Sequence, residues 1–142
     1  MTDNALPTAN GYSRAAAVVL AVWAFMHVGA AVSTWMTAGT VDGPLAGARI
    51  QQNAWHLFGM AIIVGILTPW IWRRRLGSAV VAVAITTFTD LGFIILLLLP
   101  GIVPIVPGIF GPSIWMMALI LLALAHRENL KPPAPQDASK RL

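Results

Sequence analysis

Long apolar stretches separated by a few charged positions set the pattern of this sequence. Between Arg14 and Arg127 the formal charges are Asp42, Arg49, Arg73, Arg74, Arg75 and Asp90. A hydrocarbon core about 30 Å thick needs roughly 20 apolar residues in a helix that rises 1.5 Å per residue, and the intervals between these charges have that length. The pattern therefore predicts four membrane-spanning helices, at about 15–36, 54–72, 76–99 and 109–125.

These spans predict an all-α integral membrane fold, a four-helix bundle over residues 14–126 with polar tails at 1–13 and 127–142. The first span is not expected to be a cleaved signal peptide, because its apolar run is long and no cleavage site precedes a soluble domain. The composition agrees, since 58% of the residues are hydrophobic and 10% are charged, against about a quarter charged in soluble domains. The chain has no Cys, so no disulfide or thiolate ligand is available.

The basic residues fall on one side of the predicted membrane. The side with both termini and the second loop holds Arg14, Arg73, Arg74, Arg75, Arg127, Lys131, Lys140 and Arg141, and Arg49 stands alone opposite. Basic loops stay cytoplasmic, so both termini are expected in the cytoplasm, with the chain in a cell membrane of the bacterial inner-membrane type. Because topology explains the positive charge, no nucleic-acid partner is predicted.

Aromatic residues gather near the predicted span ends, at the depth that amphipathic rings prefer. Trp35, Trp55 and Trp115 fall at the outer ends, and Tyr12, Trp70 and Trp72 at the inner ends. Only Trp23 lies deep in a span.

Asp90 is the one carboxylate inside a predicted span. A charged residue at that depth costs roughly 2.5 to 3.5 kcal/mol on insertion scales, so it should face the bundle interior. Ser78, Ala82 and Thr86 precede it at intervals of four residues and predict an inward-facing stripe. Asp90 is therefore a candidate catalytic residue, with interhelical hydrogen bonding as the structural alternative.

His27 is the second catalytic candidate, because it lies at the same predicted depth as Asp90. Each is about nine residues inside the outer end of its span, or roughly 13 Å below the same surface. A hydrogen bond between His27 and Asp90 is therefore geometrically possible. The alternative is a His capped by a backbone carbonyl or a Thr.

Three polar residues open the second predicted helix. Arg49, Asn53 and His56 are spaced four and three residues apart, which places them on one helical face. Together with Thr86 they form the predicted substrate-binding set, with Arg49 suited to a carboxylate or phosphate. The alternative is an interfacial helix start whose polar residues meet lipid headgroups.

The run Arg49-Ile-Gln-Gln-Asn53-Ala-Trp-His56 resembles the Arg-x-x-x-Asn-x-x-Glu run that opens the second helix in the MAPEG family of four-span, glutathione-dependent membrane enzymes. The resemblance implies that Arg49 and Asn53 contact glutathione. His56 stands where the family has Glu, and the last span lacks the family's Arg and Tyr positions. The run supplies an alternative function without assigning the chain to the family.

No metal and no cofactor is predicted. A haem or metal held by His27 and His56 requires both at one depth, whereas residue counting separates them by roughly 10 Å. His126, at the end of the last helix, is explained by helix capping. The segment 100–112, rich in Pro and Gly, is either a lid over the bundle or an interfacial connector.

Two hypotheses for the function follow. In the first, the chain is an accessory or scaffold subunit that packs against other membrane proteins, as a homo-oligomer or in a larger complex, because no catalytic motif is complete and small residues suit close helix contacts. In the second, it is a small enzyme or binder for an apolar, lipid-like substrate, with Asp90 and His27 as an acid and base pair. The first is preferred.

Overall fold

The structure, a computed structural model, describes residues 11–130. In chain order its elements are α1 (Gly11–Thr37), the 3₁₀ turn η1 (Ala38–Thr40), α2 (Pro44–Trp72), α3 (Leu76–Phe93), the π-helical segment η2 (Ile94–Leu98), α4 (Ile105–Gly108) and α5 (Phe110–Asn129). Four of these helices, counting α3 and η2 as one, are long and apolar enough to cross a membrane. This confirms the helical fold and four long apolar helices at the positions predicted for the spans. The tails fall largely outside the described residues.

Helix α2 begins earlier than the predicted residue 54. Gly43 precedes it with a φ of 97°, and Pro44 occupies the first turn, where a missing N–H group costs nothing. The residues that follow Pro44 include Leu, Ala, Arg and Gln, which are good helix formers. Hydropathy located the apolar part of the helix, whereas the polar first turns form because of their helix propensity.

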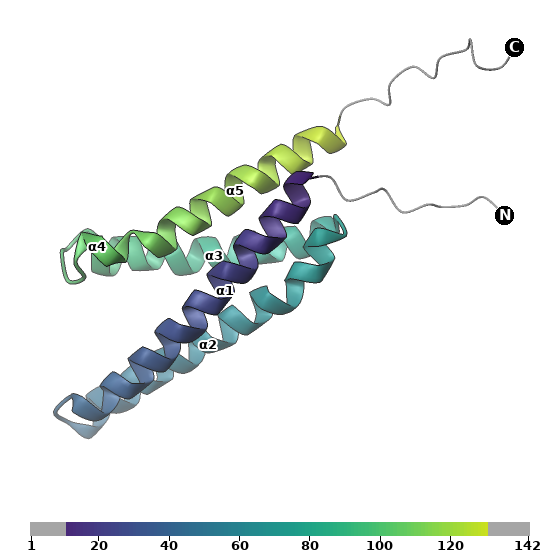
Figure 1. Ribbon diagram of the computed structural model, residues 1–142. Helices are drawn as coiled ribbons and strands as arrows, with labels where there is room; N and C mark the ends of the chain where they lie inside the picture. The colour runs from purple at the N-terminus through teal and green to yellow at the C-terminus, as the bar shows by residue number, and fades with distance from the viewer. Residues whose placement is uncertain (1–10, 131–142) are drawn as a thin grey trace, which may run out of the picture.

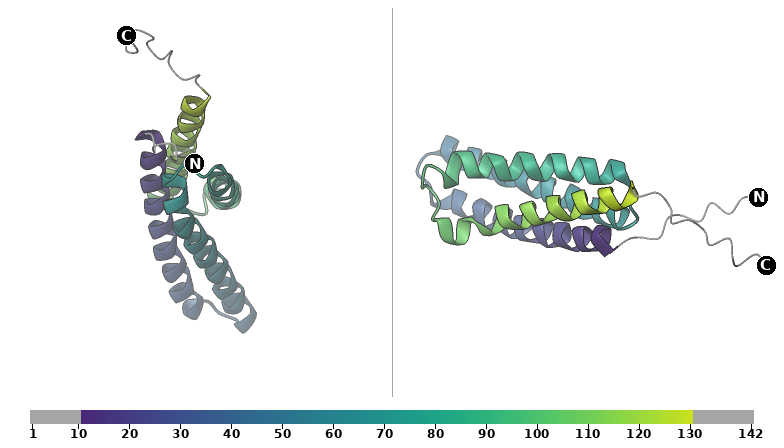
Figure 2. Two further views of the ribbon diagram at one scale, coloured as in Figure 1. Left: turned by 90° about the vertical axis from the view of Figure 1, so that its right-hand side faces the viewer. Right: turned by 90° about the horizontal axis from the view of Figure 1, so that it is seen from above.

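The α1–α2 hairpin and the α3–α5 pair lie together at one end and separate at the other (Figures 1 and 2). At the end that we call the terminal end, α1 begins, α2 turns into α3, and α5 finishes. At the opposite end, the loop end, η1 joins α1 to α2, and α4 lies between α3 and α5. The α1–α2 hairpin tilts away from α3 and α5 toward the loop end, so the bundle is splayed rather than parallel.

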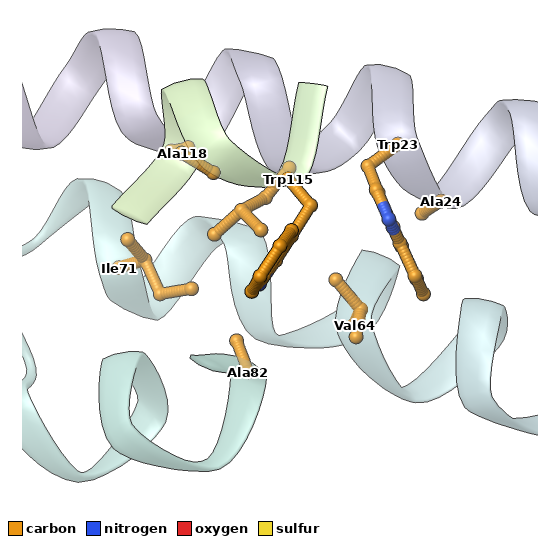
Figure 3. Close-up of a cluster of buried hydrophobic side chains, with 9 residues drawn as sticks. Trp23, Ala24, Val64, Ile71, Ala82, Trp115 and Ala118 are labelled. Carbon is orange, nitrogen blue, oxygen red and sulfur yellow. The ribbon is translucent and has the colours of Figure 1, made fainter. Parts of the chain in front are cut away.

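The core lies between the four helices and is built around two tryptophans (Figure 3). Its buried members are Ala17, Leu20, Trp23, Ala24, Val64, Ile71, Ala82, Trp115 and Ala118. Much of the remaining apolar surface is exposed, and Phe25, Phe88 and Leu99 are each more than 70% exposed. Such a surface is unusual in a soluble monomer and is typical of helices that face lipid.

Trp115 differs from the expectation of an aromatic belt at the span ends. Its ring is 7% exposed, and its Nε1–H donates a hydrogen bond to Thr87 Oγ1 at 3.1 Å. Because α5 begins at Phe110, Trp115 lies in the second turn, on the face that meets the other helices. The indole therefore ties α5 to α3 inside the bundle.

The segment between α3 and α5 closes the loop end of this pair of helices. Helix α3 passes into the π-helical segment η2, where the Leu99 N–H donates to Ile94 O at 2.8 Å. Gly101 then takes a φ of 73°, a conformation that suits Gly. Gly108 is buried, and a Cβ atom built on it would lie only 2.9 Å from Leu98 Cδ1. The chain thus folds back compactly and starts α5 beside α3.

Candidate functional site

The interior carboxylate is held by a tryptophan from another helix. Trp23 Nε1–H of α1 donates a hydrogen bond to Asp90 Oδ2 of α3 at 2.7 Å. Trp23 is fully buried and Asp90 is 1% exposed. Since the indole N–H can only donate and the carboxylate oxygen accepts, this contact satisfies both polar groups inside an apolar bundle.

His27 lies one helical turn after Trp23 on α1 and contacts both the backbone and the ring of Trp23. His27 Nδ1–H donates to Trp23 O at 2.8 Å, and the two rings stack with their centroids 3.7 Å apart. Because a carbonyl oxygen only accepts, Nδ1 is the donor in this bond, and in a neutral imidazole Nε2 is then an acceptor. Of the two alternatives for His27, the structure shows the His capped by a backbone carbonyl, and Asp90 accepts its hydrogen bond from Trp23 instead.

Gly111, in the first turn of α5, lies beside Asp90 and His27. A Cβ atom built on Gly111 would lie 3.4 Å from Asp90 Oδ1 and 3.8 Å from His27 Cε1. Asp90 and His27 are thus neighbours across the first turn of α5, as their matched depths predict. We call Trp23, His27, Asp90 and Gly111 the polar cluster.

The stripe predicted on the third helix faces inward. Ala82, Thr86 and Asp90 are buried, and Ser78 is half-buried. Thr86 Oγ1 donates to Val83 O at 3.3 Å, so the Thr86 hydroxyl bonds to its own helix. Within residues 11–130, no fully buried side-chain nitrogen or oxygen lacks a hydrogen-bond partner. The fully buried polar atoms are therefore satisfied within the bundle.

The remaining predicted binding residues do not join the polar cluster. Arg49, Asn53 and His56 are all exposed on α2, whose buried face is formed by Ala54, Ala61 and Val64. Arg49 Nη1 donates to Gln52 Oε1 at 3.1 Å along the same helix. These three residues, which we call the α2 polar face, point away from the bundle and do not form a mouth above Asp90.

The residues that could hold a metal are likewise dispersed. In the part of the chain that the structure describes, no group of three His, Asp or Glu side chains is arranged to bind an ion. The polar cluster places Asp90 Oδ1 and the His27 ring beside Gly111. Chemically, this pair can accept and donate protons or accept hydrogen bonds.

Sequence reasoning missed two members of the polar cluster. Trp23 carries a signal, because a Trp deep in a span needs an acceptor for its N–H group, and Asp90 is the acidic residue within the predicted spans. Gly111 carries none, since its role depends on how the segment after α3 folds back. Its place beside Asp90 and His27 follows only from the tertiary structure.

Comparisons of the chain with protein families, with curated proteins and with solved structures find no match. The likeness of the run from Arg49 to His56 to the MAPEG family stays a resemblance.

Proposed function

We propose that this chain is a four-span protein of a bacterial-type inner membrane, with both termini in the cytoplasm, that acts as an accessory subunit packing against another membrane protein. Four long apolar helices support insertion. The basic residues of the described part support the orientation. Arg14 near the start of α1, the run 73–75 after α2 and Arg127 near the end of α5 belong to the terminal end, and Arg49 near the start of α2 lies toward the loop end.

The direction of the polar side chains carries this proposal. Asp90, the residue best suited to interior chemistry, is engaged by Trp23. The α2 polar face, Arg49, Asn53 and His56, points outward instead. The fully buried polar atoms of the described residues have hydrogen-bond partners, and other polar groups are exposed on the surface. This arrangement favours a protein that contacts a neighbouring protein over one that encloses a substrate.

The depth of the α2 polar face fits contact with such a neighbour. Counting back from Trp72, about 20 residues cross a 30 Å core and reach Asn53. Asn53 and His56 then lie at the outer interface, and Arg49 stands beyond it. A partner contacts this face at the membrane surface, where exposed apolar residues such as Trp55, 65% exposed, adjoin the polar ones.

Site-specific photo-crosslinking in the native membrane tests this proposal. A photoreactive amino acid at Asn53 is expected to give one discrete protein adduct, and Arg49→Glu in the same chain is expected to abolish it. The matched control is the same probe at Phe88, an exposed residue of α3, which is expected to react with lipid only. Equal adducts at both positions, or none that depends on Arg49, contradict the proposal.

One observation favours a second candidate function, acid–base chemistry on a lipid-like substrate. Asp90 Oδ1 and His27 both face Gly111, so a carboxyl and an imidazole border one point. Proton transfer, isomerisation or addition needs such a pair and no further group from the chain. Mass spectrometry of small molecules that copurify with the chain tests it. A compound that is lost in both Asp90→Asn and His27→Gln supports this function, and retention in both variants excludes the pair.

A further inference from the structure

A cleft with a volume of about 360 Å³ opens at the terminal end of the bundle. Its walls come mainly from α3 and α5, with α1, α2 and the turn between α2 and α3 at its margin. Its rim includes Arg74 and Arg75, and its apolar wall includes Ala79, Val80, Ala84 and Ala125. The cleft thus has an apolar wall and a basic rim, and its volume is in the range of small-molecule sites, roughly 300 to 1,000 Å³.

The side-chain hydrogen bond that joins α3 to α5 lies further from this end than the cleft does. The hydrogen bond from Trp115 Nε1–H to Thr87 Oγ1 joins the two helices at 3.1 Å. About one helical turn closer to the terminal end, Ala84 lines the cleft on α3, and Ala125 lines it near the end of α5. Small side chains there leave space between the helices that no side chain of the described residues fills.

The turn between α2 and α3 fixes the basic rim. Arg74 has a φ of 61°, the Arg74 N–H donates to Ile71 O, and the Arg75 N–H donates to Trp70 O, both at 2.9 Å. These bonds form a Schellman motif, which sets the direction in which the chain leaves a helix. Arg75 then directly precedes α3. The motif therefore holds the backbone of Arg74 and Arg75 at the mouth of the cleft.

The charge around the cleft is strongly positive. Among the described residues, the terminal end carries Arg14, Arg73, Arg74, Arg75 and Arg127 against the single carboxylate of Glu128. The Arg14 guanidinium lies 5.5 Å from the centre of the Trp72 ring, and Arg14 is not among the residues that line the cleft. Arg74 and Arg75 are the arginines that line the cleft, so an anionic group is the complementary ligand for the rim.

We propose that this cleft binds one anionic phospholipid, with its phosphate at Arg75 and Arg74 and an acyl chain along α3 toward Ala84. The inference rests on the membrane insertion proposed above. From Arg75 to Ala84, α3 rises about 14 Å, which is close to half of a 30 Å hydrocarbon core. The cleft therefore spans one leaflet, with its charged rim at headgroup level.

The charged rim decides which lipid is preferred. An acyl chain gains little by leaving bulk lipid for an apolar cleft, because both environments are equally apolar. Each basic residue near an anionic membrane surface contributes about 1 kcal/mol, which corresponds to about a fivefold change in affinity. The charge of the headgroup therefore decides which lipid the cleft prefers. The volume between α3 and α5 decides whether an acyl chain can enter it.

Native mass spectrometry of the full chain in mild detergent tests the site. Phosphatidylglycerol and phosphatidylcholine with identical acyl chains are the two lipid probes, and inorganic phosphate tests the headgroup alone. One phosphatidylglycerol is expected to bind, in preference to phosphatidylcholine, and phosphate is expected to compete poorly. Arg75→Gln is expected to reduce the preference about fivefold. The matched control Arg73→Gln, in the same turn and outside the cleft lining, is expected to leave the preference unchanged.

A steric variant separates the cleft from diffuse surface charge. Ala84→Phe places a larger side chain in the cleft, and Ala84 is exposed, so folding is expected to persist while binding of both lipids is lost. Equal effects of Arg73→Gln and Arg75→Gln, or unchanged lipid binding in Ala84→Phe, overturn the site. Equal binding of the two lipids overturns it while leaving membrane insertion intact. A chain that stays soluble without detergent and binds neither lipid shows instead that insertion itself is wrong.

Discussion

Trp23 and Asp90 are 67 residues apart in the chain and 2.7 Å apart between Nε1 and Oδ2. This hydrogen bond joins α1 to α3 in the interior, and His27 stacks on the same indole. Among the interior residues, Asp90 is the one whose position in an apolar span most needs an explanation, and Trp23 provides it. The carboxylate stabilises the packing of helices whose apolar surfaces alone do not specify one arrangement.

The first prediction concerns the strength of this bond. Trp23→Phe removes the donor, and Asp90→Ala leaves the indole N–H unpaired in the core. Each is expected to lower the free energy of unfolding in detergent by about 1 to 3 kcal/mol. A double-mutant cycle should give a coupling energy of roughly 1.5 kcal/mol, near the upper end for membrane proteins. Strictly additive losses would show that the two residues do not interact.

Asp90→Asn provides the matched control for that cycle. An amide oxygen at the position of Oδ2 still accepts the indole hydrogen bond. The expected loss of unfolding free energy is about 1 kcal/mol or less, clearly smaller than that of Asp90→Ala. If Asp90→Asn instead destabilises as strongly as Asp90→Ala, the carboxylate has a role beyond accepting from Trp23.

The second prediction concerns the space at Gly111. A Cβ there meets Asp90 and His27 at ordinary contact distances, so Gly111→Ala is expected to be close to neutral in a thermal unfolding assay. Gly111→Leu drives further atoms into the same two side chains and is expected to cost about 1 to 3 kcal/mol. The control is Gly29→Leu, since a Cβ on Gly29 has nothing within 4 Å. Equal tolerance of Leu at both positions would place Gly111 away from the cluster.

The third prediction concerns orientation in the membrane. Because the chain has no Cys, single cysteines can be introduced without a background. Gly39→Cys at the loop end is expected to react with a membrane-impermeant maleimide on intact cells, and Gly77→Cys at the terminal end only after lysis. A Cβ added to either glycine would meet nothing within 4 Å, so neither change should disturb folding. The reverse labelling pattern would contradict the proposed topology.

Charge spacing and hydropathy predicted the four helices because each feature is local. The stretches without formal charge that flank Asp42, Arg49 and Asp90 are long enough for a helix to span a membrane. The structure contains four helices with that length and apolar character. The inward stripe on α3 also follows from spacing alone, since Ala82, Thr86 and Asp90 recur at helical intervals and are buried. These features need no knowledge of how the helices are arranged.

The polar contacts were less predictable because they depend on rotation and tilt of the helices. Depth matching placed His27 near Asp90, and both border Gly111, but depth cannot tell which side chain of α1 reaches the carboxylate. One turn of helix separates His27 from Trp23, and the rotation of α1 gives the contact to Trp23. Arg49, Asn53 and His56 share one face as their spacing predicts. That face points outward because Ala54 and Ala61 pack inward.

The fourth prediction concerns the α2 polar face and the accessory role. Arg49→Glu and Asn53→Ala alter exposed side chains, so the unfolding free energy of the isolated chain is expected to change by no more than about 0.5 kcal/mol. Association with the partner is expected to weaken in both variants, with the charge reversal having the larger effect. Variants at the exposed Phe88 of α3 serve as the control. Variants that lower the unfolding free energy but still associate with the partner would contradict a partner-binding role for the α2 polar face.

The mass of the native assembly is the decisive measurement. The chain has a mass of 15.2 kDa. Extracted from its own membrane in mild detergent, it is expected to migrate in one defined complex of larger mass that contains a second membrane protein, and Arg49→Glu is expected to release the chain from it. Recovery of the wild-type chain as a stable 15.2 kDa monomer, with no associated protein, would contradict an accessory role.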